Sequence, residues 1–240
     1  MRELKQYEIC LQQACQNCSI NLDDDMLDKF EKYFNLLSDW NEKINLTAIT
    51  QKEDVYKKHF ADSIYGAKYI APNSTLCDIG TGAGFPAVVL KIVRPDLDVL
   101  LVDALDKRIK FLNEVIVSLN LDRIKAVHFR AEDVAFKKQY LNHFDILTAR
   151  AVARMATLNE YCLPFVKVGG KFLAYKSDKI DEELCKSKKS IEVLGGKNYL
   201  THEYILDSET KRIIVEIEKT KPTDDKYPRD KNRAKTNPIV

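Results

Sequence analysis

The feature that most constrains how this chain folds is a glycine-rich turn that interrupts an apolar run. Residues 76–79 predict a buried strand, glycines follow at positions 80, 82 and 84, and residues 85–93 predict a buried helix. A dinucleotide-binding turn has two residues between its second and third glycines, whereas this turn has one. Pro86 gives the helix start a preset φ but no N–H, which leaves fewer donors for a pyrophosphate. The pattern therefore predicts a nucleotide-type cofactor without a bridging pyrophosphate.

An acidic residue at the end of the next predicted strand, 98–103, indicates how the cofactor's sugar is held. Asp103 comes 19 positions after Gly84 (103 − 84), near the offset of about 20 at which an acidic side chain meets ribose hydroxyls in such folds. A carboxylate can accept hydrogen bonds from both the 2′ and the 3′ hydroxyl, and it argues against a 2′-phosphate. A lone aspartate here is as often a solvated turn residue, but the preceding glycine turn favours the ribose role.

Strands and helices alternate after the turn. Further strands are predicted at 124–129, 144–148 and 171–175, and helices at 107–119 and 155–166, with a break at Gly169-Gly170. Two last strands, 200–206 and 212–218, are too close in sequence for a helical crossover, so they must pair as a hairpin. We predict an α/β fold with a mostly parallel sheet, helices on both faces and an antiparallel last hairpin.

Three parts of the sequence resemble a known family. They are the turn Asp78-Ile79-Gly80-Thr81-Gly82-Ala83-Gly84-Phe85-Pro86, the pair Asn45-Leu46-Thr47-Ala48-Ile49 and Lys58-His59-Phe60-Ala61-Asp62-Ser63, and Ala131-Glu132-Asp133. Together they resemble the bacterial 16S rRNA guanine-N7 methyltransferases, also called glucose-inhibited division protein B, over most of the chain. The glycine turn alone indicates only a class I methyltransferase, and the other segments make the resemblance specific.

The resemblance implies a class I S-adenosylmethionine-dependent methyltransferase fold, Rossmann-like with seven strands, plus an N-terminal helical cap. It implies S-adenosylmethionine as the cofactor and N7 of a guanine in 16S rRNA, naked or within the assembling small ribosomal subunit, as the target. Alternatives are a class I methyltransferase that acts on another RNA or on a ring nitrogen of a small molecule, a NAD-dependent oxidoreductase and a non-catalytic RNA-binding module. The glycine spacing opposes the oxidoreductase.

The resemblance also implies a set of binding residues. Those carried over for the cofactor are Gly80, Phe85, Ala131, Glu132 and Arg150, to which the residue chemistry adds Gly82 and Asp103. Backbone at Gly80 and Gly82 can approach the methionine part because no Cβ intervenes. Arg154 and Lys176 are candidates for the guanine O6 or a flanking phosphate, with a solvated surface residue as the alternative for each.

The segment after the fourth strand narrows the reaction. Amino-group methyltransferases of nucleobases carry Asn or Asp, two prolines and an aromatic residue there, whereas this chain has Thr148-Ala149-Arg150. Carbon-5 methylation needs a cysteine nucleophile after a proline, and Cys162-Leu163-Pro164 reverses that order. A ring nitrogen such as N7 carries an exposed lone pair, so alignment and charge stabilisation suffice. We assign no catalytic residue.

The N-terminal region predicts an amphipathic helix. Asn21-Leu22-Asp23-Asp24-Asp25 offers an N-cap and an acidic first turn. A stripe at helical spacing follows, made of Met26, Phe30, Tyr33, Leu37 and Trp40. Packing of a helical cap is favoured over an RNA-stacking surface. We expect a cap at 1–70, a methyltransferase domain at 71–220 and a tail at 221–240.

Composition limits the classes of protein. The chain has 240 residues, of which 45% are hydrophobic and 31% charged, which predicts a compact core. No run approaches the about 18 apolar residues of a membrane span, and the polar start is unlike a secretory signal. Cys15 and Cys18 form a C-x-x-C, but no second pair completes a zinc site. We expect a cytoplasmic monomer with reduced thiols that binds neither a metal nor a membrane.

The net charge of +2 gives little support to nucleic-acid binding, but the C-terminus is locally basic. Residues 219–240 contain seven basic side chains, Lys231 among them, and three acidic ones, a local charge of +4. Tyr227-Pro228-Arg229 and Asn237-Pro238 suggest an extended tail. The tail could lie on phosphates or be merely solvated.

Overall fold

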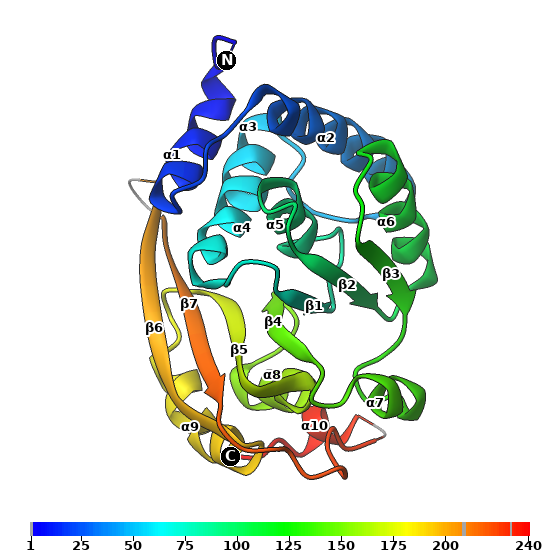
Figure 1. Cartoon of the computed structure of the whole chain (residues 1–240), viewed down its shortest axis with the longest axis vertical. Coiled ribbons are helices and arrows are strands. Elements are labelled where there is room, and N and C mark those ends of the chain that lie inside the picture. Colours follow the sequence, from blue (N-terminus) through cyan, green and yellow to red (C-terminus); the bar gives the residue numbers. More distant parts are fainter. Residues whose placement is uncertain (1, 208–209, 231) are drawn as a thin grey trace. The chain divides into compact units, whose positions relative to one another are not determined.

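The computed structural model describes residues 2–207, 210–230 and 232–240, so Lys231 lies outside the described residues. Seven strands form a sheet in the order β3-β2-β1-β4-β5-β7-β6 (Figure 1). The strands are β1 Thr75–Ile79, β2 Asp98–Asp103, β3 Ile124–His128, β4 Phe144–Arg150, β5 Val166–Ser177, β6 Gly196–Asp207 and β7 Thr210–Lys219. The pairs β2–β3, β1–β4 and β4–β5 are parallel, and β5–β7 and β6–β7 are antiparallel. The predicted fold class and the terminal hairpin are confirmed.

The chain divides into two compact units, 1–73 with 81–128 and 74–80 with 129–240. Helices of the first unit are α1 Ile9–Asn17, α2 Asp24–Ile44, α3 Lys52–Val55, α4 Asp62–Ile64, α5 Ala87–Val93 and α6 Asp106–Ser118. Helices of the second unit are α7 Val134–Tyr140, α8 Met155–Cys162, α9 Asp181–Val193 and α10 Arg233–Thr236. The helix after the glycine turn begins at Ala87, two residues later than predicted, because Pro86 occupies its N-cap position.

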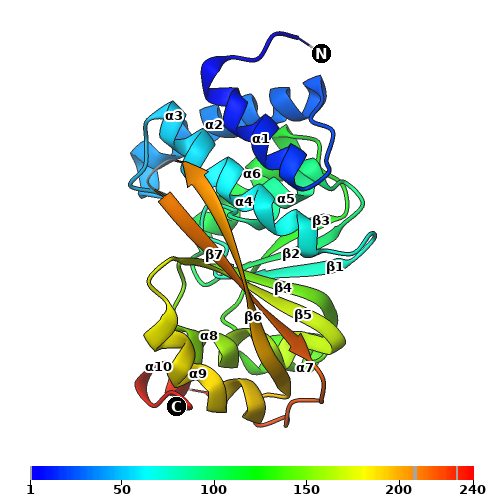
Figure 2. The same cartoon turned by 90° about the vertical axis from the view of Figure 1, so that its left-hand side faces the viewer.

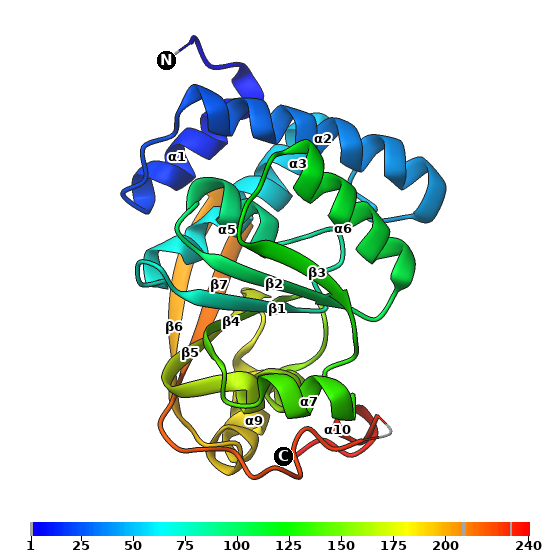
Figure 3. The ribbon, with the colours of Figure 1, turned by 45° about the vertical axis from the view of Figure 1, so that its right-hand side comes forward.

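In the first unit, the aromatic stripe of α2 belongs to the core. Asp23 caps the helix by accepting a hydrogen bond from the Met26 N–H at 2.8 Å. The fully or nearly buried residues are Leu27, Phe30, Tyr33 and Leu37, so Leu27 takes the buried place predicted for Met26. Trp40 donates to Glu114 of α6 at 3.0 Å, and Figure 3 shows α2 lying along α6. The packing role predicted for this stripe is confirmed.

In the second unit, the predicted break at Gly169-Gly170 is wrong, since β5 runs through both glycines. Gly169 has φ +86°, and the register with β4 shifts between Phe144 and Ile146. A Cβ on Gly170 would lie 2.5 Å from the Asp145 carbonyl oxygen. The two glycines therefore make an irregularity within a strand and do not end it. Figure 2 shows β6 and β7 toward the viewer, where they form a long hairpin of the second unit.

The C-terminal segment, 227–230 with 232–240, is folded onto α8, so the extended conformation predicted for it is wrong. The Arg229 guanidinium forms two hydrogen bonds with Glu160, Nε to Oε1 at 2.8 Å and Nη2 to Oε2 at 2.7 Å. The Arg229 backbone N–H also donates to Oε1 at 2.8 Å, and Glu160 is fully buried. Thr157 donates to the Ala234 carbonyl at 2.9 Å, and Ala234 is fully buried in α10. The ion pair with the buried Glu160 and the buried side chain of Ala234 hold this segment in place.

Candidate functional site

The glycine turn offers its backbone to solvent at two positions. Between Leu76 and Val93 every residue is buried except Gly80 and Gly82. Both have positive φ, +70° and +61°, a conformation that a side chain disfavours. The Thr81 N–H donates to the Val102 carbonyl at 3.1 Å, which fixes the turn. A ligand can therefore approach the main chain at Gly80 and Gly82.

The third glycine serves packing. A Cβ on Gly84, at φ +95°, would lie 2.5 Å from the Tyr33 hydroxyl oxygen and 2.6 Å from a Val88 methyl carbon. The buried Tyr33 hydroxyl donates to the Ala83 carbonyl. Tyr33 of α2 thus supports the turn directly, a contact that helical spacing alone could not reveal.

Asp103 is buried and faces the turn within the first unit. Its Oδ2 accepts from the Gly82 N–H at 2.9 Å and from Arg108 Nη1 at 3.2 Å, and its Oδ1 accepts from the Leu105 N–H at 3.0 Å. The exposed fraction of Asp103 is 3%. A carboxylate has about four acceptor positions, so these three donors leave capacity for a ligand hydroxyl. The sequence predicted Asp103 but not its partner Arg108.

The segments 45–49 and 58–63, which carry much of the family resemblance, meet at Phe85. Thr47 Oγ1 and His59 Nε2 share a hydrogen bond of 2.8 Å, and the Ile49 N–H donates to the same Thr47 oxygen at 3.1 Å. The His59 ring stacks on Phe85 with centroids 4.6 Å apart and planes 19° apart. Phe85 is 6% exposed. The sequence alone assigns no role to these segments, and in the structure they support Phe85.

In the second unit, the end of β4 lies beside Gly80. Arg150 ends the strand, and Ala151 follows with φ +58°, a left-handed conformation that is strained for alanine. Val152 then comes so close to Gly80 that a Cβ there would lie 2.8 Å from its Cγ2 atom. The strained residue thereby directs the chain after Arg150 toward the glycine turn.

Ala131 and Glu132 lie just before α7. Ala131 is buried, and the side chain of Glu132 is 13% exposed. The pKa of the Tyr161 hydroxyl is raised, first by burial and then by the negative charges of Glu132 and Glu160. Glu132 is therefore near Tyr161 of α8. The contact of Glu132 with an adenine stays a prediction.

Lys176 holds the loop that carries Arg154. Its Nζ donates to the Ala153 carbonyl at 2.8 Å and pairs with Glu183 Oε1 at 2.6 Å. Glu183 also accepts from the Met155 N–H. The ammonium of Lys176 thus positions the β4–α8 connection, and a direct substrate contact stays a prediction. Arg154 itself is exposed and lines a hollow of about 790 Å³.

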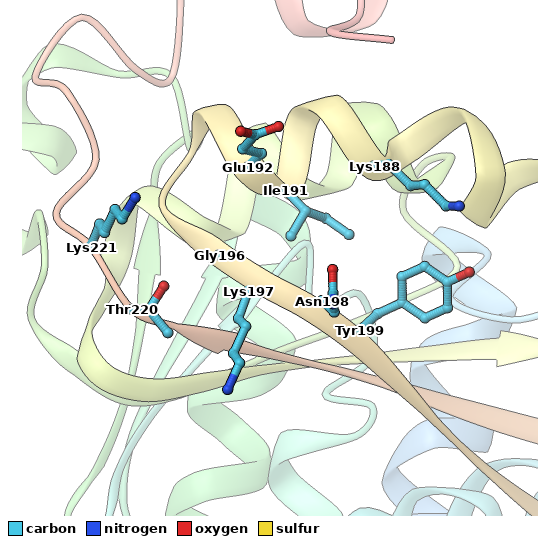
Figure 4. Close-up of a pocket in the computed structure, with 9 residues that line it drawn as sticks. All are labelled: Lys188, Ile191, Glu192, Gly196, Lys197, Asn198, Tyr199, Thr220 and Lys221. Atoms are coloured by element: carbon cyan, nitrogen blue, oxygen red, sulfur yellow. The ribbon is translucent and has the colours of Figure 1, made fainter.

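A second hollow, of about 640 Å³, contains none of the predicted site residues. It lies between the C-terminal end of α9 and the start of β6, with Lys188, Lys197 and Lys221 among its lining. Figure 4 shows these lysines spread apart, with no common point to which they turn. We call this hollow the α9–β6 trough.

The cysteines of the chain are not joined in disulfide bonds. All six cysteines are free thiols, and burial raises the pKa of the Cys15 thiol to about 12. Within residues 2–207, 210–230 and 232–240, no three His, Cys, Asp or Glu side chains gather as a metal site would require. Over the same residues, no helix combines the length and apolar character of a membrane span.

Comparison with known proteins decides the family. The model of the GidB family, rRNA small subunit methyltransferase G, matches residues 26–213. The chain belongs to this family. A ribosomal RNA small subunit methyltransferase G of Exiguobacterium sp. is 46% identical over 222 residues, 91% of this chain and 93% of its own length. Its counterpart in Acetivibrio thermocellus is 47% identical over 241 residues, 100% of this chain and 99% of its own.

A solved structure supports the fold of this GidB-family chain. TYW2 from P. horikoshii in complex with MeSAdo has a TM-score of 0.51 and 18% identity, covering 66% of this chain and 61% of TYW2. At this identity the likeness concerns the fold alone. The family and the class I methyltransferase fold predicted from the sequence are both confirmed.

Proposed function

We propose that this chain transfers the methyl group of S-adenosylmethionine to N7 of a guanine in 16S rRNA. The observation that carries the proposal is the match to the GidB family over residues 26–213, with relatives 46% and 47% identical that are named as small subunit rRNA methyltransferases. Ribosomal subunits assemble in the cytoplasm, so we infer that the chain acts there, and as a monomer.

The residues of the chain fit S-adenosylmethionine. In the part that the structure describes, the Thr81 hydroxyl oxygen is buried and has no hydrogen-bond partner, beside the accessible backbone of Gly80 and Gly82. In our proposal the turn takes the methionine part, Asp103 accepts from a ribose hydroxyl and Phe85 forms an apolar wall. Ala131 and Glu132 bind the adenine, and Arg150 binds the cofactor carboxylate or the substrate. The residues that we propose to bind the cofactor are therefore Gly80, Gly82, Phe85, Asp103, Ala131, Glu132 and Arg150.

The chemistry asks little of the protein beyond alignment. The cofactor, when bound, supplies an electrophilic methyl group on a sulfonium centre. The N7–carbon bond forms as the sulfur–carbon bond breaks, and no proton has to leave N7. The chain therefore needs no general base, and its residues orient the guanine and stabilise the shifting charge. Arg154 is the proposed donor to the guanine O6 or to a neighbouring phosphate, and Lys176 holds its loop.

The test is methyl transfer from labelled S-adenosylmethionine to 16S rRNA, naked and within small subunits. We expect label at N7 of guanine, mapped by chemical cleavage at the modified base and by mass spectrometry. Label at another atom or in another RNA would contradict the proposal, and binding of NADH without S-adenosylmethionine would revive the oxidoreductase. The Gly80→Arg variant is the control, because a large side chain at this position blocks the turn and should abolish transfer.

A further inference from the structure

The hollow beside Arg154 adjoins the glycine turn. Val152 lines this hollow of about 790 Å³ and also lies against Gly80, 2.8 Å from the place of a Cβ. Arg154 and Tyr161 also line it. Its volume lies in the range of about 300–1,000 Å³ that small-molecule sites occupy. One extruded nucleotide fits this range, and a duplex does not.

Four cationic and two acidic side chains line the hollow, Arg154, Lys179, Lys186 and Lys235 against Glu182 and Glu183, so positive charge is in excess. Lys186 pairs with Glu182 at 2.5 Å, and Lys176 pairs with Glu183 at 2.6 Å. Lys179 and Lys235, both exposed, have no ion-pair partner within the described ranges. Lys179, Lys235 and Arg154 together present three cations to a ligand in the hollow. Exposed cations of this kind are the usual partners of nucleic-acid phosphates.

The C-terminal segment makes one wall of the hollow, and the wall is firmly held. Lys235 and Pro238 line the hollow from this segment. Arg229 anchors the segment to the fully buried Glu160 at 2.7 and 2.8 Å. Lys235 therefore extends from a fixed turn, α10, and its position does not depend on a loose tail.

We propose that this hollow receives the target guanosine in extruded form, with its flanking phosphates on Arg154, Lys179 and Lys235. N7 of a guanine in an A-form helix faces a deep, narrow groove, so the base has to leave the stack to be methylated. The C-terminal segment then contributes directly to substrate binding. This inference rests on the proposed function, because the guanosine is the substrate of that reaction.

The test compares two pairs of exposed lysines in one unit. Lys179→Ala with Lys235→Ala removes two charges from the hollow, and Lys188→Ala with Lys197→Ala removes two from the α9–β6 trough, whose lysines also lack ion-pair partners among the described residues. We expect the first pair to raise the Kd for a 16S rRNA fragment about tenfold and to lower the slope of log Kd against log salt by about one to two. The trough pair should change Kd less than twofold.

Two further readouts keep the result interpretable. Affinity for S-adenosylmethionine, measured by calorimetry, should stay unchanged in both pairs, and Lys179→Arg with Lys235→Arg should restore RNA binding. Equal losses in both pairs, or none in the hollow pair, would overturn the inference. RNA binding needs no methyl transfer, so a chain that binds rRNA without methylating it would refute the proposed function while the two pairs still test the hollow.

Discussion

At Gly80 two separate constraints act on one residue, its φ of +70° and its contact with Val152. Gly169 shares the first constraint, with φ +86°, but a Cβ there meets nothing within 4 Å. The two glycines therefore form a matched pair in which only one also has to accommodate a neighbour.

We predict that Gly80→Ala lowers the free energy of unfolding by more than Gly169→Ala. The left-handed backbone costs about 1–2 kcal/mol for any L side chain, and the Val152 contact adds to this at Gly80 alone. Gly80→Ala should also weaken S-adenosylmethionine binding, and Gly169→Ala should not. Urea unfolding and calorimetry measure both effects. Equal stability losses with equal cofactor affinity would contradict the role given to Gly80.

Lys219 is a fully buried cation whose hydrogen-bond acceptors are neutral groups. Its Nζ donates to the Leu163 carbonyl and to the Thr223 hydroxyl oxygen, both at 2.6 Å, and burial lowers the pKa of the ammonium to about 7 from 10.5. Between these two pH values the unfolded chain binds more protons at this residue than the folded chain does. The contribution of Lys219 to stability therefore rises with pH across this window.

We predict that Lys219→Met flattens the rise of unfolding free energy between pH 7 and 10.5 relative to the unaltered chain. The exposed Lys211→Met serves as the control and should leave the pH profile parallel to that of the unaltered chain. Urea unfolding at several pH values gives the difference in unfolding free energy between each variant and the unaltered chain. A pH-independent difference for Lys219→Met would show that its proton is bound equally in both states.

At the scale of elements, the hydrogen bond between Thr47 and His59 ties a loop and a helical segment of the first unit to Phe85. We predict that Thr47→Val, which keeps the shape and removes the hydroxyl, costs about 1 kcal/mol of stability because His59 loses a hydrogen bond. Affinity for S-adenosylmethionine should fall by up to about tenfold, since about 1.4 kcal/mol corresponds to that factor. Thr50→Val, at an exposed position, is the control. Unchanged cofactor affinity in Thr47→Val would show that the contact between Thr47 and His59 does not support cofactor binding.

The elements differ in how far sequence could predict them. The bounds of β2 agree with its apolar run, because a strand buried along its length leaves a clear pattern. β5 was predicted too short, because glycines that permit a bulge look like glycines that end a strand. Motif spacing found Gly80 and Asp103. It could not find Tyr33, Arg108 or Val152, whose roles arise from contacts between distant parts of the chain.

At the scale of the whole molecule, the proposed parts 1–70, 71–220 and 221–240 raise the question of whether the last part can detach. One of the contacts that fix it is the ion pair of Arg229 with the fully buried Glu160. The removal of one member of a buried ion pair strands the other charge and costs about 3–5 kcal/mol where the pair cannot rearrange. The stranded carboxylate would expel the segment from α8 toward water.

We predict that Arg229→Gln releases residues 221–240 while the rest stays folded. Limited proteolysis should then cut within this segment faster and leave a stable core, and the Kd for a 16S rRNA fragment should rise as far as it does on loss of Lys179 and Lys235. Glu160→Gln combined with Arg229→Gln should restore part of the protection, because a neutral amide at position 160 leaves no uncompensated charge in the buried site. Cooperative unfolding of the whole chain in Arg229→Gln would instead make the segment part of the folding core, and the proposed boundary at 221 would fall with it.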